Sequence, residues 1–501
     1  MLAELHSLFG VVLLVTVLLV YRSSSSSQSS LPVINNRKAF EFRYLHARKR
    51  FLCNASDLLK AGFEKAKAFQ VMTGDDYKVV LSPDYANEIR SHPALQFAAA
   101  IAKDFHGDIP GFEAFRRGES SDEILSDAVR IKLTQNLGNL TEPLSLETTH
   151  ALQTNWTDDP NWHTVQLKPA ILQIVAQLSS KVFLGDEICR NRDWLQITRE
   201  YTVNLFIASE ALSLWPGFMR PLIARFLPSC RKLQAELRQA SNIIIPVLGK
   251  RRIEKQTCNE QGKAPERYSD AMEWIEECAK GRPYNPITAQ LSISIAAIHT
   301  TSDLVTQVLY DLAGKQDLIQ ALREEVIAML REDGWKKSTL FKLKLMDSVL
   351  KETQRMKPSD IISMRRVASA DIELSDGTVI PKDSAVMVSN HKMWDPTIYP
   401  NPDEYDGYRF LKLREKPGHE TSAQLVSPSP EHLGFGFGKH ACPGRFFATN
   451  QIKIFLCHVL LKYDFKLTEG CTPQAMRAGV VLAADPTGKL DIRRRQEEFL
   501  L

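Results

Sequence analysis

The stretch Phe435–Gly444 reads FGFGKHACPG and places one cysteine in a glycine-rich loop. Glycine has no Cβ atom, so backbone N–H groups of such a loop can approach the Cys442 sulfur closely. Lys439 and His440 add positive charge, and an apolar-rich helix is predicted directly afterwards, at 446–463. Positive charge and a helix N-terminus both favour the thiolate form of a cysteine. The pattern indicates a soft metal ligand rather than a cysteine of the hydrophobic core.

Working outward, a buried carboxylate is predicted on a helix that begins at Leu345. Apolar side chains recur at helical spacing on the face that carries Glu352, so this carboxylate points inward. A buried carboxylate needs a cationic partner, and Arg355 lies one helical turn further on. Arg409 could supply a second guanidinium to the same carboxylate.

The segment 291–312 is predicted to be a central, buried helix, because its first half is apolar on nearly all sides. Ala296 and Ala297 leave a small surface against which a flat or bulky group can pack. His299 and Thr300 then bring polar groups into the same stretch. A threonine hydroxyl in a helix commonly bonds back to the carbonyl four residues earlier, and taken alone this structural role is the simpler interpretation.

The remaining pattern is mostly helical, with a few short strands. Strands are predicted at 69–73 and 78–81, where Gly74-Asp75-Asp76 indicates a hairpin. Ser82-Pro83 then begins a helix, with the serine as its N-cap. Further short strands are predicted at 366–390, and a second hairpin at 480–491. The fold class is mainly α with small β-sheets, in one large body.

The N-terminus is predicted to be a membrane anchor. Residues 8–21 carry no charge, and a spanning helix needs about 20 mostly apolar residues. Cationic side chains are concentrated on the C-terminal side, which places the bulk of the chain in the cytosol and disfavours a cleaved signal peptide. The predicted organisation is an anchor at 1–22, a serine-rich linker at 23–36 and a single domain at 37–501.

Composition excludes several classes of protein. The net charge is +4 over 501 residues, which is too small to indicate a nucleic-acid-binding protein. The 8 cysteines are scattered and none forms a C-x-x-C pair, which excludes a zinc ribbon and a disulfide-stapled secreted domain. We therefore expect reduced cysteines in a cytosol-facing compartment.

Together these segments resemble the cytochrome P-450 superfamily of haem-thiolate monooxygenases. The Cys442 loop is similar to the haem-binding signature of that family, and Glu352 with Arg355 is similar to the pair on its K helix. Arg409 is similar to the arginine that joins that pair, and Ala296–Thr300 to the oxygen-activating part of the I helix. The resemblance covers essentially the whole chain, and it implies one large α-rich haem domain with a smaller β-rich part.

Within the superfamily, the sequence is similar in particular to fungal microsomal members that oxidise terpenoid and other secondary-metabolite skeletons. This closer match is carried by the segments 104–112 and 395–402. By resemblance, Cys442 is the axial ligand of the haem iron, and Thr300 hydrogen-bonds iron-bound oxygen. The resemblance places further residues around the haem, with His440 and Arg366 at the propionates: Phe435, Gly436, His440, Gly444 and Arg366.

Three departures from the family pattern stand out. His299 occupies the position of a usual acid, and we predict that it relays protons if its ring faces solvent. Ala297 replaces a common glycine. The usual Trp-x-x-x-Arg of the C helix is missing, and Arg130 or Lys132 is the candidate substitute.

The resemblance implies a monooxygenase with haem b that inserts one oxygen atom of O2 into an apolar substrate. The sequence has no G-x-G-x-x-G nucleotide motif, so electrons are expected from NADPH through a separate cytochrome P-450 reductase, with cytochrome b5 as a second donor. The expected location is the endoplasmic reticulum membrane, with the catalytic domain in the cytosol and no nucleic-acid partner. Two alternatives stay open: a haem-thiolate isomerase or dehydratase that needs no external electrons, and a non-catalytic membrane haem protein.

The substrate is expected to be apolar. The apolar stretches 205–207 and 214–219 are either core between two helices or a membrane-dipping entrance. Residues expected to contact substrate are Phe112, Ile293, Ala296, Ala297, Ile361, Ile362 and Val481.

Overall fold

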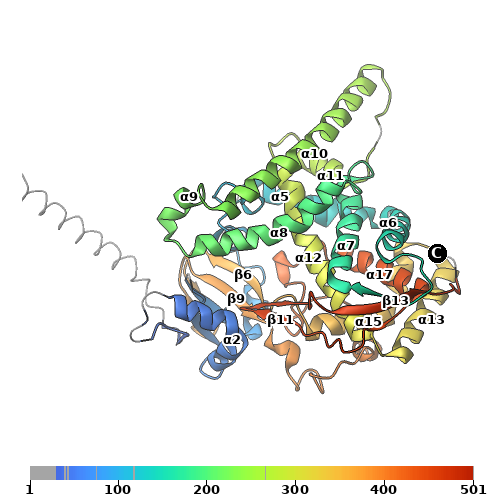
Figure 1. Cartoon of the computed structure of the whole chain (residues 1–501). Helices are drawn as coiled ribbons and strands as arrows, with labels where there is room; N and C mark the ends of the chain where they lie inside the picture. The colour runs from blue at the N-terminus through green and yellow to red at the C-terminus, as the bar shows by residue number, and fades with distance from the viewer. Residues whose placement is uncertain are drawn as a thin grey trace, which may run out of the picture.

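A computed structural model of the chain describes residues 30–38, 41, 44–74, 76–116, 119–265 and 267–499. These residues form a mainly helical body with small β-sheets, which confirms the predicted fold class. In Figure 1 the larger sheet and α2 lie on one side of this helical body, and α10 extends away from it.

The helices and strands have the following bounds. The α-helices are α2 (Leu45–Phe63), α3 (Ala86–Ile89), α4 (Phe97–Asp104), α5 (Glu119–Asp127), α6 (Thr134–Trp156), α7 (Leu167–Leu184), α8 (Arg192–Ser213), α9 (Arg220–Ile223), α10 (Pro228–Glu260), α11 (Ala271–Ala279), α12 (Pro286–Leu312), α13 (Gln316–Asp333), α14 (Lys337–Lys342), α15 (Lys344–Met356), α16 (Arg409–Arg414) and α17 (Arg445–Lys462). The strands are β1 (Val33–Ile34), β2 (Ala68–Met72), β3 (Tyr77–Leu81), β4 (Leu95–Gln96), β5 (His163–Gln166), β6 (Ile362–Ala368), β7 (Ile372–Glu373), β8 (Val379–Ile380), β9 (Ala385–Ser389), β10 (Tyr463–Leu467), β11 (Met476–Ala478), β12 (Val481–Ala483) and β13 (Lys489–Arg494). Short helical turns are η1 (Pro83–Tyr85), η2 (Glu113–Phe115), η3 (Ala128–Leu133, a π-helix), η4 (Gly217–Met219), η5 (His391–Trp394) and η6 (Gly438–His440).

The larger sheet has the strand order β1-β2-β3-β9-β6-β4. Strands β2 and β3 form the predicted antiparallel hairpin, and the predicted cap follows, since the Ser82 side chain accepts a hydrogen bond from the Asp84 amide. Strand β9 is buried along its whole length, and β6 alternates buried and half-buried residues. The alternating burial arises because successive β6 side chains point to opposite faces of the sheet.

The predicted hairpin at 480–491 is wrong. Strand β12 pairs with the preceding β11, whereas β13 pairs with β10 and with β5, which lies more than 300 residues earlier in the chain. The Asp485–Gly488 turn therefore joins two different sheets. Turn residues alone could not reveal this, because both strands take partners outside the segment.

Helix α12 lies at the centre of the fold and packs against α7, α8, α10, α15 and α17 (Figure 1). Asn285 caps its N-terminus, accepting hydrogen bonds from the amides of Ile287 and Thr288, and Pro286 stands at its first position. Ile298, Val305 and Val308 belong to the largest hydrophobic core cluster. The prediction of a central buried helix is confirmed.

The predicted anchor at 1–22 lies outside the described residues, as do residues 23–29 of the predicted linker. Among the helices that the structure describes, none has the length and apolar character needed to cross a membrane. Val33 and Ile34, inside the predicted linker, pair with β2 as a parallel strand.

Candidate functional site

The Cys442 loop joins η6 to the N-terminus of α17. The Cys442 amide donates a hydrogen bond of 2.8 Å to the Phe435 carbonyl oxygen, which closes the loop. Gly444 is the N-cap residue of α17, and the amides of Gly444 and Arg445 hydrogen-bond to the cysteine side chain. The Cys442 sulfur thus lies at a helix N-terminus, as the sequence predicts.

Burial dominates the electrostatics of Cys442 and raises the pKa of its thiol. The hydrogen bond from the Gly444 amide and the positive charge of Arg445 oppose this shift. Lys439, which the sequence suggested as a source of positive charge, is exposed. Arg445 takes this role instead, and its Nη1 donates to the Cys442 carbonyl oxygen at 2.9 Å.

Two glycines shape the loop before the cysteine. Gly436 and Gly438 have φ values of 69° and 75°, in the left-handed region that glycine adopts without strain. A Cβ atom at Gly438 would also lie 2.4 Å from the carbonyl oxygen of Arg90. Side chains are therefore excluded at this position by both conformation and space.

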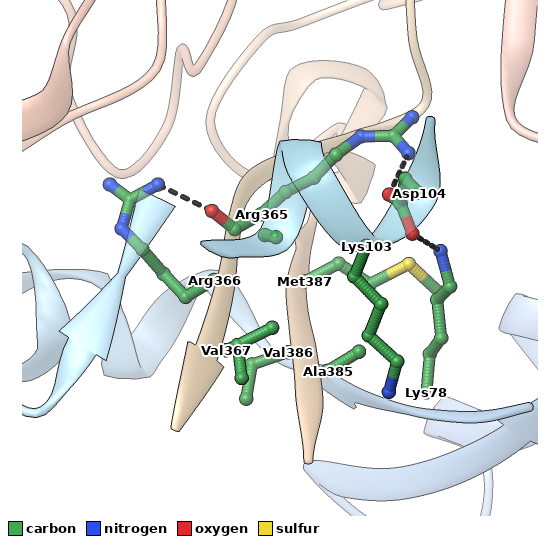
Figure 2. A pocket seen from close by; sticks show the side chains of 10 residues that line it. Lys78, Lys103, Asp104, Arg365, Arg366, Val367, Ala385, Val386 and Met387 are labelled. Carbon is green, nitrogen blue, oxygen red and sulfur yellow. Dashed lines mark hydrogen bonds and ion pairs between the residues drawn. The ribbon is translucent and has the colours of Figure 1, made fainter. Parts of the chain in front are cut away.

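Two consecutive arginines on β6 point in opposite directions (Figure 2). Arg365 reaches the Asp104 carboxylate at 3.3 Å, and Asp104 also binds Lys78 at 2.6 Å. These residues line a small hollow below α4 that contains no residue of the Cys442 loop. Arg366 turns away from the hollow's ion pairs, and its Nη1 donates to the Arg365 carbonyl oxygen at 2.7 Å.

Arg366 and His440 both lie beside the ring of Phe97. The Arg366 guanidinium lies 5.6 Å from the Phe97 ring centre, and the His440 ring lies 5.9 Å from it. Burial lowers the pKa of Arg366 to about 10. Burial and, secondly, the charge of Arg366 lower the pKa of His440 to about 4.

This pair fits an anionic group such as a haem propionate. Arg366 is 2% exposed, and within the described part of the chain its Nη2 is buried without a hydrogen-bond partner. A buried guanidinium nitrogen without an acceptor is costly, and a carboxylate is its natural partner. Cys442 and the Arg366–His440 pair therefore suit iron and carboxylate groups respectively.

The inner helix α12 exposes a narrow stripe of small residues. Ala296 and Thr300, one turn apart, are exposed, whereas Ile298 and Thr301 are buried. The Thr300 hydroxyl donates to the Ala296 carbonyl oxygen at 2.7 Å, which is the structural role considered for it from the sequence. Its oxygen keeps acceptor capacity on the exposed side of the helix.

His299 points to α8 rather than along this stripe. Its Nε2 lies 3.1 Å from the Arg199 carbonyl oxygen, which can only accept, so Nε2 carries a hydrogen and Nδ1 is an acceptor. Burial lowers the pKa of His299, and its ring is half-buried. The solvent-facing ring that the proton relay requires is therefore not what the structure shows, and the relay stays a prediction.

Glu352, Arg355 and Arg409 form a buried ionic triad. Both carboxylate oxygens of Glu352 accept hydrogen bonds from Arg355, at 2.8 and 2.9 Å, and from Arg409 Nε, at 3.0 and 3.1 Å. Arg355 also donates to the Met393 and Pro402 carbonyl oxygens. The structure thus brings together the three residues that the sequence paired.

Arg130 and Lys132 do not reach the Arg366–His440 pair through any contact among the described residues. Arg130 lies 3.3 Å from the Asp127 carboxylate and its side chain is 65% exposed. Lys132 pairs with Glu277 of α11 at 2.5 Å. Their segment does lie near the loop, since Val129 would contact a Cβ atom at Gly444, but both cations face acidic partners at the surface.

The residues expected to contact substrate fall into two groups. Phe112, Ile293 and Ile362 are packed in the hydrophobic core, with exposures of 0%, 6% and 2%, so this conformation does not place them against a ligand. Large apolar side chains on tightly packed elements fill the core first. The accessible residues of the set are Ala296, Ala297, Ile361 and Val481.

Sequence reasoning missed Phe97, Arg90 and Arg445. Arg445 could have been found, because a cation directly after Gly444 stands at the start of the helix. Phe97 and Arg90 carry no local signal, since their contacts with Arg366, His440 and Phe437 span hundreds of positions or cross between elements.

Comparison with known proteins agrees with this geometry. The family model "Cytochrome P-450" matches residues 67–491. The chain is 52% identical to the cytochrome P-450 monooxygenase adrA of Penicillium rubens over 98% of this chain and 96% of that protein. It is 51% identical to the cytochrome P-450 monooxygenase trt6 of Aspergillus terreus, over 92% and 94% of the two chains. A solved structure of a retinoic acid-bound cyanobacterial CYP120A1 shares the fold, with a TM-score of 0.69, 17% identity, and coverage of 94% of this chain and 100% of that one.

Proposed function

The chain belongs to the cytochrome P-450 family and is a monooxygenase, and we propose that it inserts one oxygen atom of O2 into an apolar terpenoid-type substrate. We further propose that its electrons come from NADPH through a separate reductase. The observation that carries the proposal is the Cys442 sulfur at the N-terminus of α17, with His440 two residues before it and Arg366 beside the same Phe97 ring as His440.

In this proposal, Cys442 holds the iron of haem b and Arg366 and His440 hold its propionates. A thiolate-ligated haem supplies the chemistry that splits dioxygen. The Gly444 and Arg445 amides orient the sulfur and stabilise negative charge on it. Gly436 allows the tight path of the loop, and Phe435 fixes the Cys442 amide through its carbonyl oxygen.

Thr300 is proposed to handle protons on the substrate side. Its hydroxyl donates to Ala296, which leaves the oxygen lone pairs free to accept a hydrogen bond from a water molecule or from a protonated oxygen. The Ala296 and Ala297 side chains are small enough to let a large apolar skeleton approach the helix. Ile361 and Val481 are the other accessible apolar residues proposed to contact it.

The α8–α9 region is proposed to lie against the endoplasmic reticulum membrane. Leu205 is buried core, but Phe206 and Ile207 are exposed, so the core interpretation of these stretches holds only in part. Phe218 is 85% exposed. The exposed apolar side chains of this region are Val203, Phe206, Ile207, Leu214, Trp215, Phe218, Leu222 and Phe226. Exposed apolar side chains of this kind, with Arg220 and Arg225 near them in the sequence, suit an anionic lipid interface, where they would receive lipid-soluble substrates.

The test is product formation by the membrane-bound protein with candidate terpenoid precursors, followed by mass spectrometry. The proposal expects products one oxygen heavier, formed only with NADPH and a P-450 reductase, with cytochrome b5 tested as a second donor. A product of unchanged oxidation state, formed without NADPH, would establish the alternative of a haem-thiolate isomerase or dehydratase.

A further inference from the structure

The segment 415–437 links α16 to the Cys442 loop and contains no helix or strand. Its first part, 415–422, is exposed residue by residue. Turn hydrogen bonds shape it locally, but its position relative to the helices depends on contacts made by other elements. The contacts that position this segment come largely from two side chains of α15, Asp347 and Lys351, which lie outside the Glu352 triad.

Lys351 of α15 holds this segment through three backbone carbonyl groups. Its Nζ donates to the carbonyl oxygens of Ser422 at 2.9 Å, Gln424 at 2.7 Å and Ser427 at 3.2 Å. The three donors of an ammonium group are thereby all used. Lys351 is 2% exposed, and its Nζ also lies 5.1 Å from the Phe410 ring centre.

Burying the Lys351 ammonium costs free energy, so its contacts must compensate for the lost hydration. Burial lowers the pKa of Lys351 to about 7, and only a full set of acceptors compensates the lost hydration of an ammonium. Asp347, one turn earlier, reinforces the same attachment, because its carboxylate accepts from the Leu425 amide at 2.9 Å and binds Lys453 of α17 at 2.7 Å. Charged groups therefore fasten 422–427 to two helices.

The fastened segment in turn contacts the cysteine loop. The Val426 carbonyl oxygen accepts a hydrogen bond from Arg445 Nε at 3.0 Å. Nη1 of the same guanidinium donates to the Cys442 carbonyl oxygen at 2.9 Å, and the Arg445 amide bonds to the cysteine side chain. A displacement of Val426 would therefore move Arg445, and with it the hydrogen bonds that Arg445 makes to the carbonyl group and to the side chain of Cys442.

We propose that Lys351 is a positioning residue for the Cys442 ligand, acting through the carbonyl groups of 422–427 and the Arg445 side chain. This inference rests on the proposed haem-thiolate site, and it assigns Lys351 a role distinct from that of its neighbour Glu352. Lys351 touches neither the sulfur nor the substrate. It fixes the backbone that aims the sulfur.

The experiment compares the wild type with Lys351→Met, which keeps the side-chain length and removes the donors, and with the milder Lys351→Gln. Lys344→Met, an exposed residue at the start of the same helix, is the matched control. The first readout is the absorbance of the reduced, carbon monoxide-bound protein, in which thiolate ligation gives a red-shifted Soret band. The second is hydrogen exchange of peptides covering 422–445 in the haem-free protein, which does not depend on catalysis.

We expect Lys351→Met to increase the fraction of haem without the red-shifted band by about threefold or more, and to speed exchange in 422–445. The double variant Lys351→Met/Arg445→Met should show a smaller change than the sum of the changes in the two single variants. The reason is that both residues act on the Cys442 loop through the same contacts. The proposal is overturned if the loaded Lys351→Met protein keeps the wild-type band and exchange, or if the two effects add. It is also overturned if both Lys351 variants unfold, since Lys351 would then serve global stability. A wild-type protein without the red-shifted band would instead refute the haem-thiolate function itself.

Discussion

The α15 side of the molecule buries charged side chains, whereas the α8–α9 side exposes apolar ones. Every residue of α15 from Leu345 to Arg355 is buried, including an aspartate, a lysine, a glutamate and an arginine, and their partners are backbone groups and opposite charges. From Leu214 to Phe226 the chain exposes apolar side chains instead. Buried, fully paired charges fix one geometry, whereas an exposed apolar surface tolerates many. This contrast fits the proposed roles of the two sides, which are to hold the cysteine ligand in place and to receive an apolar substrate.

The strongest way to break this comparison is to remove the carboxylate at the centre of α15. Glu352→Gln leaves two buried guanidinium groups without their counter-charge, and we expect a loss of about 3–5 kcal/mol in the free energy of unfolding, with little haem bound. Chemical denaturation of the haem-free protein and the haem content of purified protein measure these effects. Glu415→Gln, at an exposed position, is the control, and equal stability of the two variants would contradict the account.

The next test separates two adjacent arginines. Arg366→Met removes the buried guanidinium whose Nη2 has no partner among the described residues, and we expect haem affinity to fall by about 2 kcal/mol, or roughly thirtyfold. Arg365→Met is the matched control, because Arg365 points the other way, toward Asp104, and should affect local stability but not haem affinity (Figure 2). Haem titration of the two apoproteins decides the matter. Equal haem affinities of the Arg366→Met and Arg365→Met proteins would show that Arg366 does not bind a haem propionate.

The buried polar side also predicts a pH dependence. Burial and then the charge of Lys351 lower the pKa of His432 to about 3, from an ordinary value of 6.5. The folded protein therefore keeps this ring neutral, and its contribution to stability is complete above about pH 6.5 and is lost as the pH falls toward 3. His432→Asn should reduce the slope of stability against pH between about pH 6 and 4, by at most about 1.4 kcal/mol per pH unit. The exposed His150→Asn is the control, and identical slopes in all three proteins would show that His432 is not buried as a neutral group.

Proton delivery offers a smaller test. If His299 relays protons, His299→Ala should lower coupling of NADPH use to product by about tenfold. The half-buried ring bonded to Arg199 favours a weaker effect than a solvent-facing ring would give. Product formed per NADPH consumed is the measurement, with Thr300→Ala beside it as a reference on the same helix. Unchanged turnover and coupling in His299→Ala would end the relay hypothesis.

The smallest effect on stability is expected on the opposite side. Phe218→Ser changes an 85% exposed side chain, so the free energy of unfolding should stay within about 0.5 kcal/mol of the wild type. Binding of the chain to vesicles containing anionic lipid should nonetheless weaken. Co-sedimentation with vesicles measures this, and unaltered binding would argue against a membrane contact of η4, which carries Phe218.

Local patterns carried much of the prediction. The helical spacing around Glu352 predicts α15, the apolar run after the Cys442 loop predicts α17, and Gly74-Asp75-Asp76 predicts the β2–β3 hairpin. Arg409 was within reach because a buried carboxylate requires cations, and arginine supplies a planar pair of donors.

What could not be predicted depends on tertiary partners. Nothing near Lys351 signals that its ammonium binds carbonyl groups more than 70 positions away. The hairpin assigned to 480–491 failed for the same reason, since β13 pairs with β5. Phe112 was expected to contact substrate, yet it is 0% exposed, lies in the largest core cluster and packs edge-on against the His106 ring.

The most direct test of the central claim is the carbon monoxide spectrum of the reduced, haem-loaded protein with each candidate cysteine changed. The account predicts that Cys442→Ser abolishes the red-shifted Soret band, whereas Cys457→Ser, inside α17 and buried in the core, retains it. A red-shifted band that survives in Cys442→Ser, or its absence from the wild type, would contradict the assignment of Cys442 as the haem ligand.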